Sequence, residues 1–271
     1  MNNNFGSFDF NGTTAVVTGG ASGMGREIAI AFAESGANVV IGDINEEGLS
    51  SLKTEIGDAC EAVYTDVTNV THVNSLIDHA VKEFGSVDVG VNCAGASVPA
   101  PILEISEEAW DKNLDLNLKG IFLAMKHEAL QMRAQGRGGV IINITSVTAS
   151  VSALGLAHYA SAKAGANHLT RIAANEFRDL GIRVVGIAPG LIRTPLAEMV
   201  WSNTELRDAY VENVPCNRVG EVKDIAQTAL FLASKGADYI NGEIIHVDGG
   251  HKANGAFADQ SNIRAQYLET L

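Results

Sequence analysis

Short apolar runs alternate along the chain with longer stretches in which apolar residues recur at helical spacing. The short runs are rich in β-branched residues, so they predict buried strands, and the longer stretches predict helices. We expect strands at residues 14–18, 38–43, 60–65, 87–92, 139–145, 183–188 and 243–247. We expect helices at 26–33, 45–56, 70–84, 106–135, 157–180 and 222–234, with an irregular segment at 190–220.

This alternation predicts the architecture of the chain. Strands separated by helices form a parallel sheet with helices on both faces. No linker, repeat or low-complexity segment divides the 271 residues, so we expect one α/β domain over 1–271 with seven strands. Residues 251–271 form a C-terminal tail, which either packs on a neighbouring subunit or frays.

A glycine-rich turn lies between the first predicted strand and the first predicted helix. Glycines let the backbone approach a pyrophosphate, and the helix N-terminus offers unpaired N–H groups, so this order of elements forms a phosphate cradle. The turn predicts a Rossmann-like, doubly wound dinucleotide-binding fold; the alternative is an ordinary tight turn in a glycine-rich chain. The candidate cofactor-binding residues of the turn are Gly19, Ser22, Gly23, Met24 and Gly25.

An acidic residue, Asp43, ends the second predicted strand. Its carboxylate can accept hydrogen bonds from the hydroxyls of an adenosine ribose and repels a 2′-phosphate. No arginine follows it, so the sequence predicts NAD rather than NADP as the cofactor. The alternative is that Asp43 caps the helix at 45–56.

Polar and glycine residues also follow the other predicted strands. Ligands bind at the carboxyl ends of parallel strands, so we expect these residues to gather at one edge of the sheet. Besides the residues already named, the candidates at these strand ends are Asp66, Val67, Asn92, Ala94, Gly95, Ser146, Pro189, Gly190, Ile192 and Thr194.

Tyr159 and Lys163 stand four positions apart on the predicted helix at 157–180, so they share one face. A neighbouring ammonium favours the phenolate, so we expect Lys163 to lower the pKa of Tyr159 from its ordinary value of about 10. A tyrosine tuned in this way serves in proton transfer near neutral pH. Ser146 precedes it by thirteen residues and, taken alone, also fits a turn residue.

Composition excludes several classes of function. The formal net charge is −13 and the isoelectric point about 4.9, so the surface repels nucleic acid and anionic membranes. The three cysteines and seven histidines show no metal-binding spacing, and the cysteines form no disulfide framework. The N-terminal residues lack a signal-peptide pattern and no apolar run is long enough to span a bilayer, so we expect a soluble, cytoplasmic protein.

Together these residues resemble the short-chain dehydrogenase/reductase family, over residues 12–250. The resemblance rests on Thr18-Gly19-x-x-x-Gly23-x-Gly25, Asn92-x-Ala94-Gly95, Asn117, Ser146, Tyr159-x-x-x-Lys163 and Pro189-Gly190. It implies an oxidoreductase that transfers a hydride between NAD(H) and a secondary alcohol or ketone. In such enzymes the cofactor carries the hydride, while the protein orients it and manages one proton.

The resemblance also implies four catalytic roles. Tyr159 is implied to be the general acid or base, and Lys163 to lower its pKa and bind the nicotinamide ribose. Ser146 is implied to hold the substrate oxygen, and Asn117 to hold a water that links Lys163 to solvent.

In the cofactor site, the resemblance implies contacts at both ends of the dinucleotide. Ile192 and Thr194 are implied to contact the nicotinamide carboxamide, while Asp66 and Val67 are implied to flank the adenine.

The substrate is the least determined part of the prediction. We expect a mainly apolar pocket wall within reach of the loop 190–220, with segment 194–216 as a lid, and the hypothesis is an apolar or mixed secondary alcohol of modest size. The alternatives are a 3-oxoacyl-(acyl-carrier-protein) reductase, a sugar, polyol or steroid dehydrogenase, and a non-catalytic NAD-sensing protein. The candidate substrate residues are Ser97, Thr148, Leu154, Leu191, Met199 and Trp201.

The two longest predicted helices, 106–135 and 157–180, carry apolar residues on more than one face. Excess apolar helix surface indicates a subunit interface. Since family members are commonly tetramers, the resemblance implies a homotetramer.

Overall fold

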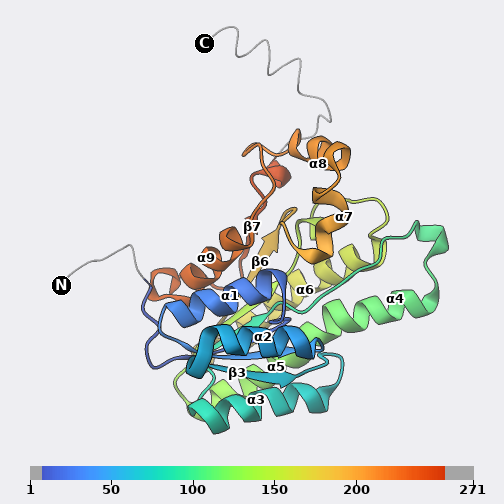
Figure 1. Ribbon diagram of the computed structural model, residues 1–271. Helices are drawn as coiled ribbons and strands as arrows, with labels where there is room; N and C mark the ends of the chain where they lie inside the picture. The colour runs from blue at the N-terminus through green and yellow to red at the C-terminus, as the bar shows by residue number, and fades with distance from the viewer. Residues whose placement is uncertain (1–7, 254–271) are drawn as a thin grey trace.

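One parallel sheet forms the centre of the protein, as a computed structural model of residues 8–253 describes it (Figure 1). The strands lie in the order β3-β2-β1-β4-β5-β6-β7, and all neighbours pair in parallel. They are β1 (Thr14–Thr18), β2 (Asn38–Asp43), β3 (Cys60–Tyr64), β4 (Val89–Asn92), β5 (Gly139–Ile144), β6 (Ile182–Pro189) and β7 (Ile244–Val247). The predicted seven-stranded, Rossmann-like sheet is therefore confirmed.

Helices cover both faces of this sheet, as predicted. One buried cluster joins the sheet to α1, α2 and α9, and another joins its opposite face to α3, α5 and α6. The helices are α1 (Gly23–Glu34), α2 (Glu46–Ile56), α3 (Val70–Phe84), α4 (Glu107–Leu114), α5 (Gly120–Gln135), α6 (Ala157–Glu176), α7 (Glu198–Trp201), α8 (Thr204–Val211) and α9 (Val222–Ala233).

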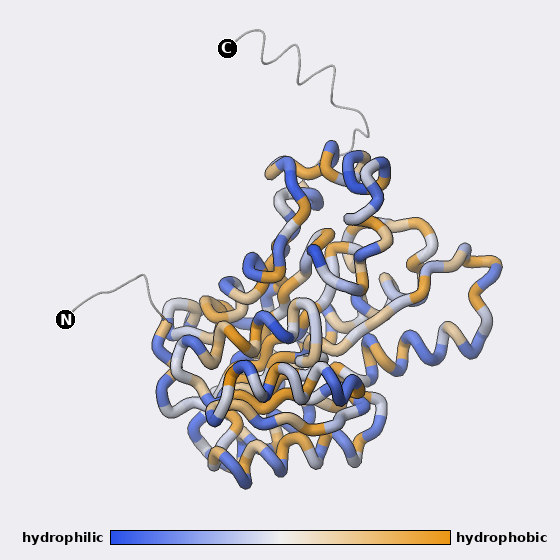
Figure 2. The backbone as a smooth tube through the Cα atoms, viewed as in Figure 1, coloured by the Kyte–Doolittle hydropathy of each residue, from blue (hydrophilic) through white to orange (hydrophobic). Residues whose placement is uncertain are grey.

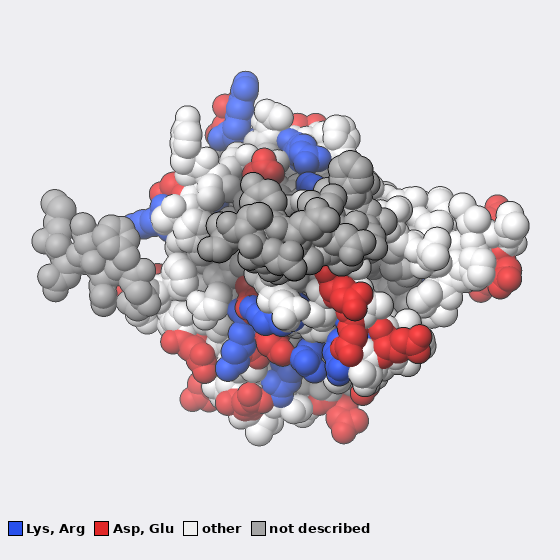
Figure 3. Space-filling view, turned by 90° about the horizontal axis from the view of Figure 1, so that it is seen from above, with Lys and Arg blue, Asp and Glu red and all other residues white. Residues whose placement is uncertain are grey.

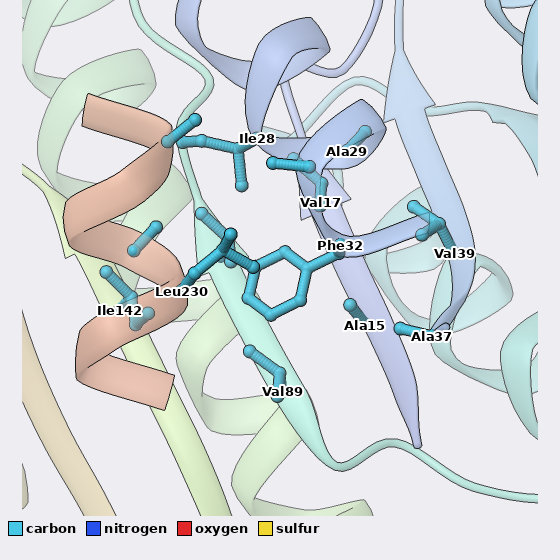
Figure 4. Packing of buried hydrophobic residues seen from close by; sticks show 14 of the residues in the cluster. Ala15, Val17, Ile28, Ala29, Phe32, Ala37, Val39, Val89, Ile142 and Leu230 are labelled. Carbon is cyan, nitrogen blue, oxygen red and sulfur yellow. The ribbon is translucent and has the colours of Figure 1, made fainter. Parts of the chain in front are cut away.

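The strand β1 is buried on both faces of the sheet, so its three central residues are all apolar. Ala15 and Val17 lie in the first cluster, whereas Val16 between them lies in the second, because successive strand side chains point to opposite faces. In Figure 4 the ring of Phe32 from α1 lies among side chains of the sheet and Leu230 of α9. Each buried side chain of this size contributes about 1.5–3 kcal/mol. Figure 2 shows the resulting pattern, with hydrophobic strands inside helices of mixed hydropathy.

The predicted continuous helix at 106–135 is wrong, because a π-helical turn, Asp115–Lys119, separates α4 from α5. A side-chain hydrogen bond gives a physical reason. Asn117 Nδ2 donates to the Asn113 carbonyl oxygen at 3.1 Å, an acceptor that a regular α-helix would offer to the backbone N–H of Asn117. Such turns widen a helix and occur often at functional sites.

The segment 190–220 is also more ordered than predicted, since it contains α7 and α8. Asn203 begins α8 by accepting a hydrogen bond from the Leu206 backbone N–H at 3.1 Å, a capping signal that the sequence contained. The helix predicted at 157–180 ends at Glu176 and continues as a 3₁₀ turn, Arg178–Leu180. Of the predicted tail, His251–Ala253 form a 3₁₀ turn, and the rest lies outside the described residues.

The sheet order locates the site. Strand β1 lies between β2 and β4, so the connections from β1 and from β4 leave in opposite directions. A crevice forms at such a switch point, beyond the carboxyl ends of the strands, and ligands of doubly wound sheets bind there. Within residues 8–253, no helix is long and apolar enough to cross a membrane.

Candidate active site

A cavity of about 900 Å³ lies at this switch point. Its volume is within the range of small-molecule binding sites, roughly 300–1,000 Å³. The residues predicted to bind a cofactor that line it are Gly19, Ser22, Gly23, Met24, Gly25, Asp43, Asp66, Val67, Ala94, Gly95 and Thr194. The structure therefore brings together residues from the turns after β1, β2, β3, β4 and β6.

The glycine-rich turn leaves no room for a side chain at Gly19 or Gly25. Gly19 has a φ of +70°, and a Cβ at Gly25 would lie 2.2 Å from the Gly19 carbonyl oxygen. The N-cap residue of α1, Ser22, makes no side-chain capping hydrogen bond. The first N–H groups of α1 thus remain available to an anion, as a phosphate cradle requires.

Asp43 faces the cavity and holds the turn in place. Its Oδ2 accepts a hydrogen bond from the Ala21 backbone N–H at 3.1 Å, and its Oδ1 accepts one from Asn45 at 3.0 Å. Helix α2 is capped by Asn45, whose side chain accepts from the Gly48 N–H, so the alternative of Asp43 as the helix cap is wrong. Among the described residues, Lys112 is the one basic side chain that lines the cavity.

Ser146, Tyr159 and Lys163 meet where β5 ends beside α6. The Lys163 Nζ lies 5.6 Å from the centre of the Tyr159 ring and donates to the Ile144 carbonyl oxygen at 2.9 Å. Ser146 Oγ accepts hydrogen bonds from the backbone N–H of Thr148 at 3.1 Å and from its hydroxyl at 2.9 Å. A hydroxyl has one proton to donate, so that of Ser146 remains available toward Tyr159, with which Ser146 is hydrogen-bonded.

The pKa of Tyr159 is raised in this structure, whereas the spacing to Lys163 predicted that it would be lowered. Burial raises the pKa of Tyr159 to about 12, more than the hydrogen bond with Ser146 lowers it. Lys163 is also buried, which lowers its pKa to about 8. Desolvation disfavours the charged form of both groups, and this outweighs the effect that spacing alone predicts.

Asn117 lies in the π-helical turn and is fully buried. Its Nδ2 donates to the Ala96 carbonyl oxygen at 2.8 Å, whereas its Oδ1 has no hydrogen-bond partner. A Cβ at Gly95 would lie 2.7 Å from this oxygen and 3.3 Å from Lys163 Nζ. An unpaired buried oxygen beside an ammonium is a site that suits a bridging water.

Six predicted cofactor residues do not line the cavity: Asn92, Tyr159, Lys163, Pro189, Gly190 and Ile192. The Asn92 side chain points into the core, where it is 1% exposed and bonded to Glu128 and Asn143. Gly190 packs against Tyr210 and Asp248, and Ile192 is buried in the core. Spacing along the chain placed these residues at the correct sheet edge but could not show where their side chains point.

The predicted substrate residues lie in diverse environments. Thr148 bonds to Ser146, and Ser97 Oγ accepts from Asn113 Nδ2 at 3.2 Å. Trp201 Nε1 donates to the Thr194 carbonyl oxygen at 2.8 Å.

The remaining candidates differ mainly in exposure. Leu154 is fully exposed and Met199 is 77% exposed. The backbone N–H of Leu191 donates to Tyr210 Oη at 2.9 Å.

Sequence reasoning missed one wall of the cavity, which α4 and the π-helical turn supply through Glu108, Asp111, Lys112, Asp115 and Leu116. These positions recur at helical spacing, so they share a face, but nothing in the sequence showed that this face crosses the cavity. Ile44 and Tyr64 were missed as well. No group of three or more potential metal ligands occurs within residues 8–253.

Comparison with known proteins agrees with this geometry. A family model described as enoyl-(acyl carrier protein) reductase matches residues 19–252. A 3-oxoacyl-(acyl-carrier-protein) reductase of Staphylococcus epidermidis is 39% identical over 242 residues, which cover 88% of this chain and 98% of the relative. The enzyme of that name from Thermotoga maritima is 36% identical, with coverage of 88% and 97%.

A solved structure is also similar, that of a 7α-hydroxysteroid dehydrogenase in complex with NADH and 7-oxo glycochenodeoxycholic acid. It shares 36% identity and a TM-score of 0.85, covering 89% of this chain and 95% of that one. The motifs, the sheet order and these similarities lead to one conclusion: the chain belongs to the short-chain dehydrogenase/reductase family and is an oxidoreductase.

Proposed function

We propose that this protein is an NAD(H)-dependent oxidoreductase that interconverts a secondary alcohol and its ketone. The observation that carries the proposal is the meeting of Ser146, Tyr159 and Lys163 beside the cavity at the switch point. Gly95 shows that these three residues adjoin the cavity. It lines the cavity, and a Cβ at this position would lie 3.3 Å from Lys163 Nζ.

The residues of the cavity fit a dinucleotide. Gly19 and Gly25 make a cradle that a side chain would fill, and the N–H groups of α1 can bind the phosphates. We expect the remaining residues of the cavity to hold the adenosine and nicotinamide ends, with Asp66 and Val67 near the adenine and Thr194 near the nicotinamide. When bound, the nicotinamide supplies or accepts the hydride.

The chain's own residues then transfer one proton to or from the substrate. Tyr159 exchanges it with the substrate oxygen, and Ser146 holds that oxygen by donating its hydroxyl proton. Because burial raises the pKa of Tyr159 to about 12, the phenol stays protonated at neutral pH and is ready to donate in ketone reduction. For alcohol oxidation the phenolate must be stabilised, and the nearby Lys163 ammonium is the group that can do this.

NAD is favoured over NADP by the charges around the cavity. Asp43 lies where an adenosine ribose is expected, and Lys112 is the one basic side chain in the described lining. A 2′-phosphate next to Asp43 would bring like charges together without a guanidinium to offset them. The similar hydroxysteroid dehydrogenase was solved with NADH, which also supports this choice.

An uncharged substrate is favoured by the rim of the site. Val98, Ile102 and Leu103 are exposed apolar residues of the segment before α4, and from above this part of the surface carries mostly uncharged side chains (Figure 3). Lys112 is the one basic side chain in the described lining, so the cavity offers no basic cluster to bind a phosphate-bearing prosthetic group of a substrate. The second candidate is nevertheless 3-oxoacyl reduction, because similar proteins, among them those of Staphylococcus epidermidis and Thermotoga maritima, carry that name.

A homotetramer in the cytoplasm is part of the proposal. An apolar hollow of about 470 Å³ lies between the π-helical turn, α5 and α6, where Phe122 and Ile172 are each 42% exposed. Apolar surface of this kind marks contacts between proteins. A monomeric mass by light scattering would contradict the assembly, and secretion of the protein would contradict the location.

The deciding experiment measures reduction of NAD and of NADP by the purified protein with secondary alcohols, polyols, hydroxysteroids and 3-hydroxyacyl thioesters. We expect NADH formation with an uncharged secondary alcohol and much less NADPH. Turnover confined to 3-hydroxyacyl thioesters would favour the second candidate. NADH binding without any turnover would favour a non-catalytic sensor, and absence of both would contradict the proposal.

A further inference from the structure

Glu128 of α5 is a carboxyl group in the middle of the protein. It is 0% exposed and lies over β4, where Gly90 leaves room for it: a Cβ at Gly90 would be 2.3 Å from Glu128 Cδ. Burying an acid is costly unless it is paired or neutral. The proton exchange proposed for Tyr159 does not use this group, so its presence in the core requires another reason.

Glu128 is one end of a buried hydrogen-bond network that crosses four elements. Asn92 of β4 donates its Nδ2 to Glu128 Oε2 at 3.1 Å and to Asn143 Oδ1 of β5 at 3.0 Å. Asn143 Nδ2 donates to Thr170 Oγ1 of α6 at 3.0 Å, and that hydroxyl donates to the Ala166 carbonyl oxygen at 2.8 Å. All four side chains are at most 1% exposed.

The two asparagines at the middle of this network adjoin the proposed active site along their strands. Asn143 precedes Ile144, whose carbonyl oxygen accepts from Lys163 Nζ. Asn92 precedes Cys93 and the cavity-lining turn that follows β4. The network therefore fixes the strand that anchors Lys163 relative to the strand that leads into the cofactor turn.

The hydrogen-bond inventory indicates which form of the acid is present. A carboxylate has about four lone-pair sites to satisfy, yet Glu128 has one donor, Asn92 Nδ2, and its Oε1 has no partner. Asn92 Oδ1 is also an unpaired acceptor. A neutral acid has fewer acceptor sites to satisfy than a carboxylate and carries no charge, so one donor leaves less of it unsatisfied.

We propose that Glu128 is a positioning residue of the active site and that it acts as a neutral carboxylic acid. In this form it completes the network that links the Lys163 anchor to the cofactor turn. The positioning role rests on the proposed function, whereas the neutral state does not.

The electrostatic surroundings agree with the geometry. Burial raises the pKa of Glu128 to about 8, and the hydrogen bond from Asn92 lowers it only in part. No charged side chain acts on it from the described parts of β4, β5, α5 or α6. Because the folded pKa is raised, the stabilising contribution is complete below the unfolded value of about 4.3 and is lost as the pH rises through about 8.

The first test compares the wild type with Glu128→Gln, which remains neutral and keeps an oxygen acceptor for Asn92. Urea unfolding is measured from pH 6 to pH 9, with the exposed Glu176→Gln as the matched control. Relative to Glu128→Gln, we expect the folding equilibrium constant of the wild type to fall about tenfold per pH unit up to about pH 8. The control should follow the wild type, and parallel curves for wild type and Glu128→Gln would overturn the neutral acid.

The second test addresses positioning through NADH fluorescence and turnover. Glu128→Leu removes the acceptor of Asn92, so NADH affinity should fall about tenfold, whereas Glu128→Gln should restore most of it. Should Glu128→Leu not fold, Thr170→Val cuts the far end of the same network and should show a smaller loss. Wild-type affinity in a folded Leu or Val variant would overturn the positioning role.

These readouts separate this inference from the proposed function. If the wild type bound no NADH, the proposed function and the positioning role would both be contradicted. The unfolding comparison would still decide the protonation state, because it needs no ligand.

Discussion

The sides of this molecule that we propose for the cofactor and for the substrate are built differently. On the cofactor side, backbone packs on backbone: a Cβ at Gly19 would lie 2.7 Å from the Ala94 nitrogen, and one at Gly25 would lie 2.2 Å from the Gly19 oxygen. On the substrate side, side chains project outward, with Leu103 at 96% exposed and Leu154 fully exposed.

This difference explains why the cofactor can be inferred from the structure more readily than the substrate. A turn that requires glycine at positions 19 and 25 is restricted to few shapes, and such a turn before a helix is typical of a phosphate site. A rim of exposed side chains has many shapes, and what it recognises depends on details of loops. In the proposed function, the rigid side therefore determines the cofactor and the open side the choice of substrate.

The largest effect is expected from Tyr159→Phe. It removes the proposed proton donor but leaves the cradle, so turnover should fall about 10²- to 10⁴-fold with little change in NADH affinity. Initial rates and NADH fluorescence measure the two effects. Tyr239→Phe, at a fully exposed position, is the matched control. More than a tenth of wild-type turnover would remove Tyr159 from the chemistry.

A smaller effect is expected from Asp43→Ser, which tests the rigid side alone. Loss of the carboxylate removes repulsion of a 2′-phosphate, worth several kcal/mol between like charges, so the ratio of kcat/KM for NADP to that for NAD should rise at least about tenfold. Steady-state kinetics with both cofactors give the ratio, and the exposed Asp58→Ser serves as control. An unchanged ratio would mean that Asp43 does not contact the ribose.

The smallest effect is expected on the open side, from Trp201→Phe. This variant keeps an aromatic ring for the contact with Arg193 but loses the N–H that donates to the Thr194 carbonyl oxygen. Loss of one such bond should raise the KM for substrate roughly threefold to tenfold, with turnover largely retained. Identical constants across a substrate panel would show that the loop 194–201 is held in other ways.

Sequence patterns predicted the sheet, its parallel strands and most of the cavity, because these follow from local rules. Alternation, β-branched runs and the glycine turn each impose a conformation without help from distant residues. The π-helical turn could not be predicted, because it depends on Asn117 bonding to Asn113 and to the Ala96 carbonyl oxygen. The wall formed by α4 and the inward direction of Asn92 depend likewise on tertiary packing.

The pKa of Tyr159 is a similar case. The spacing to Lys163 was visible in the sequence, but the burial that raises the phenol pKa to about 12 was not. Burial is a property of the assembled fold, so the sign of such a shift cannot be obtained from spacing alone.

A single backbone hydrogen bond joins two parts of the open rim. The Ala100 N–H, before α4, donates to the Gly155 carbonyl oxygen, before α6, at 2.9 Å. Residues that share a contact have non-additive mutational effects. Substitutions in the segment 97–104 should therefore be epistatic with those in 150–156, so a library that randomises either segment alone samples only part of the accessible specificities.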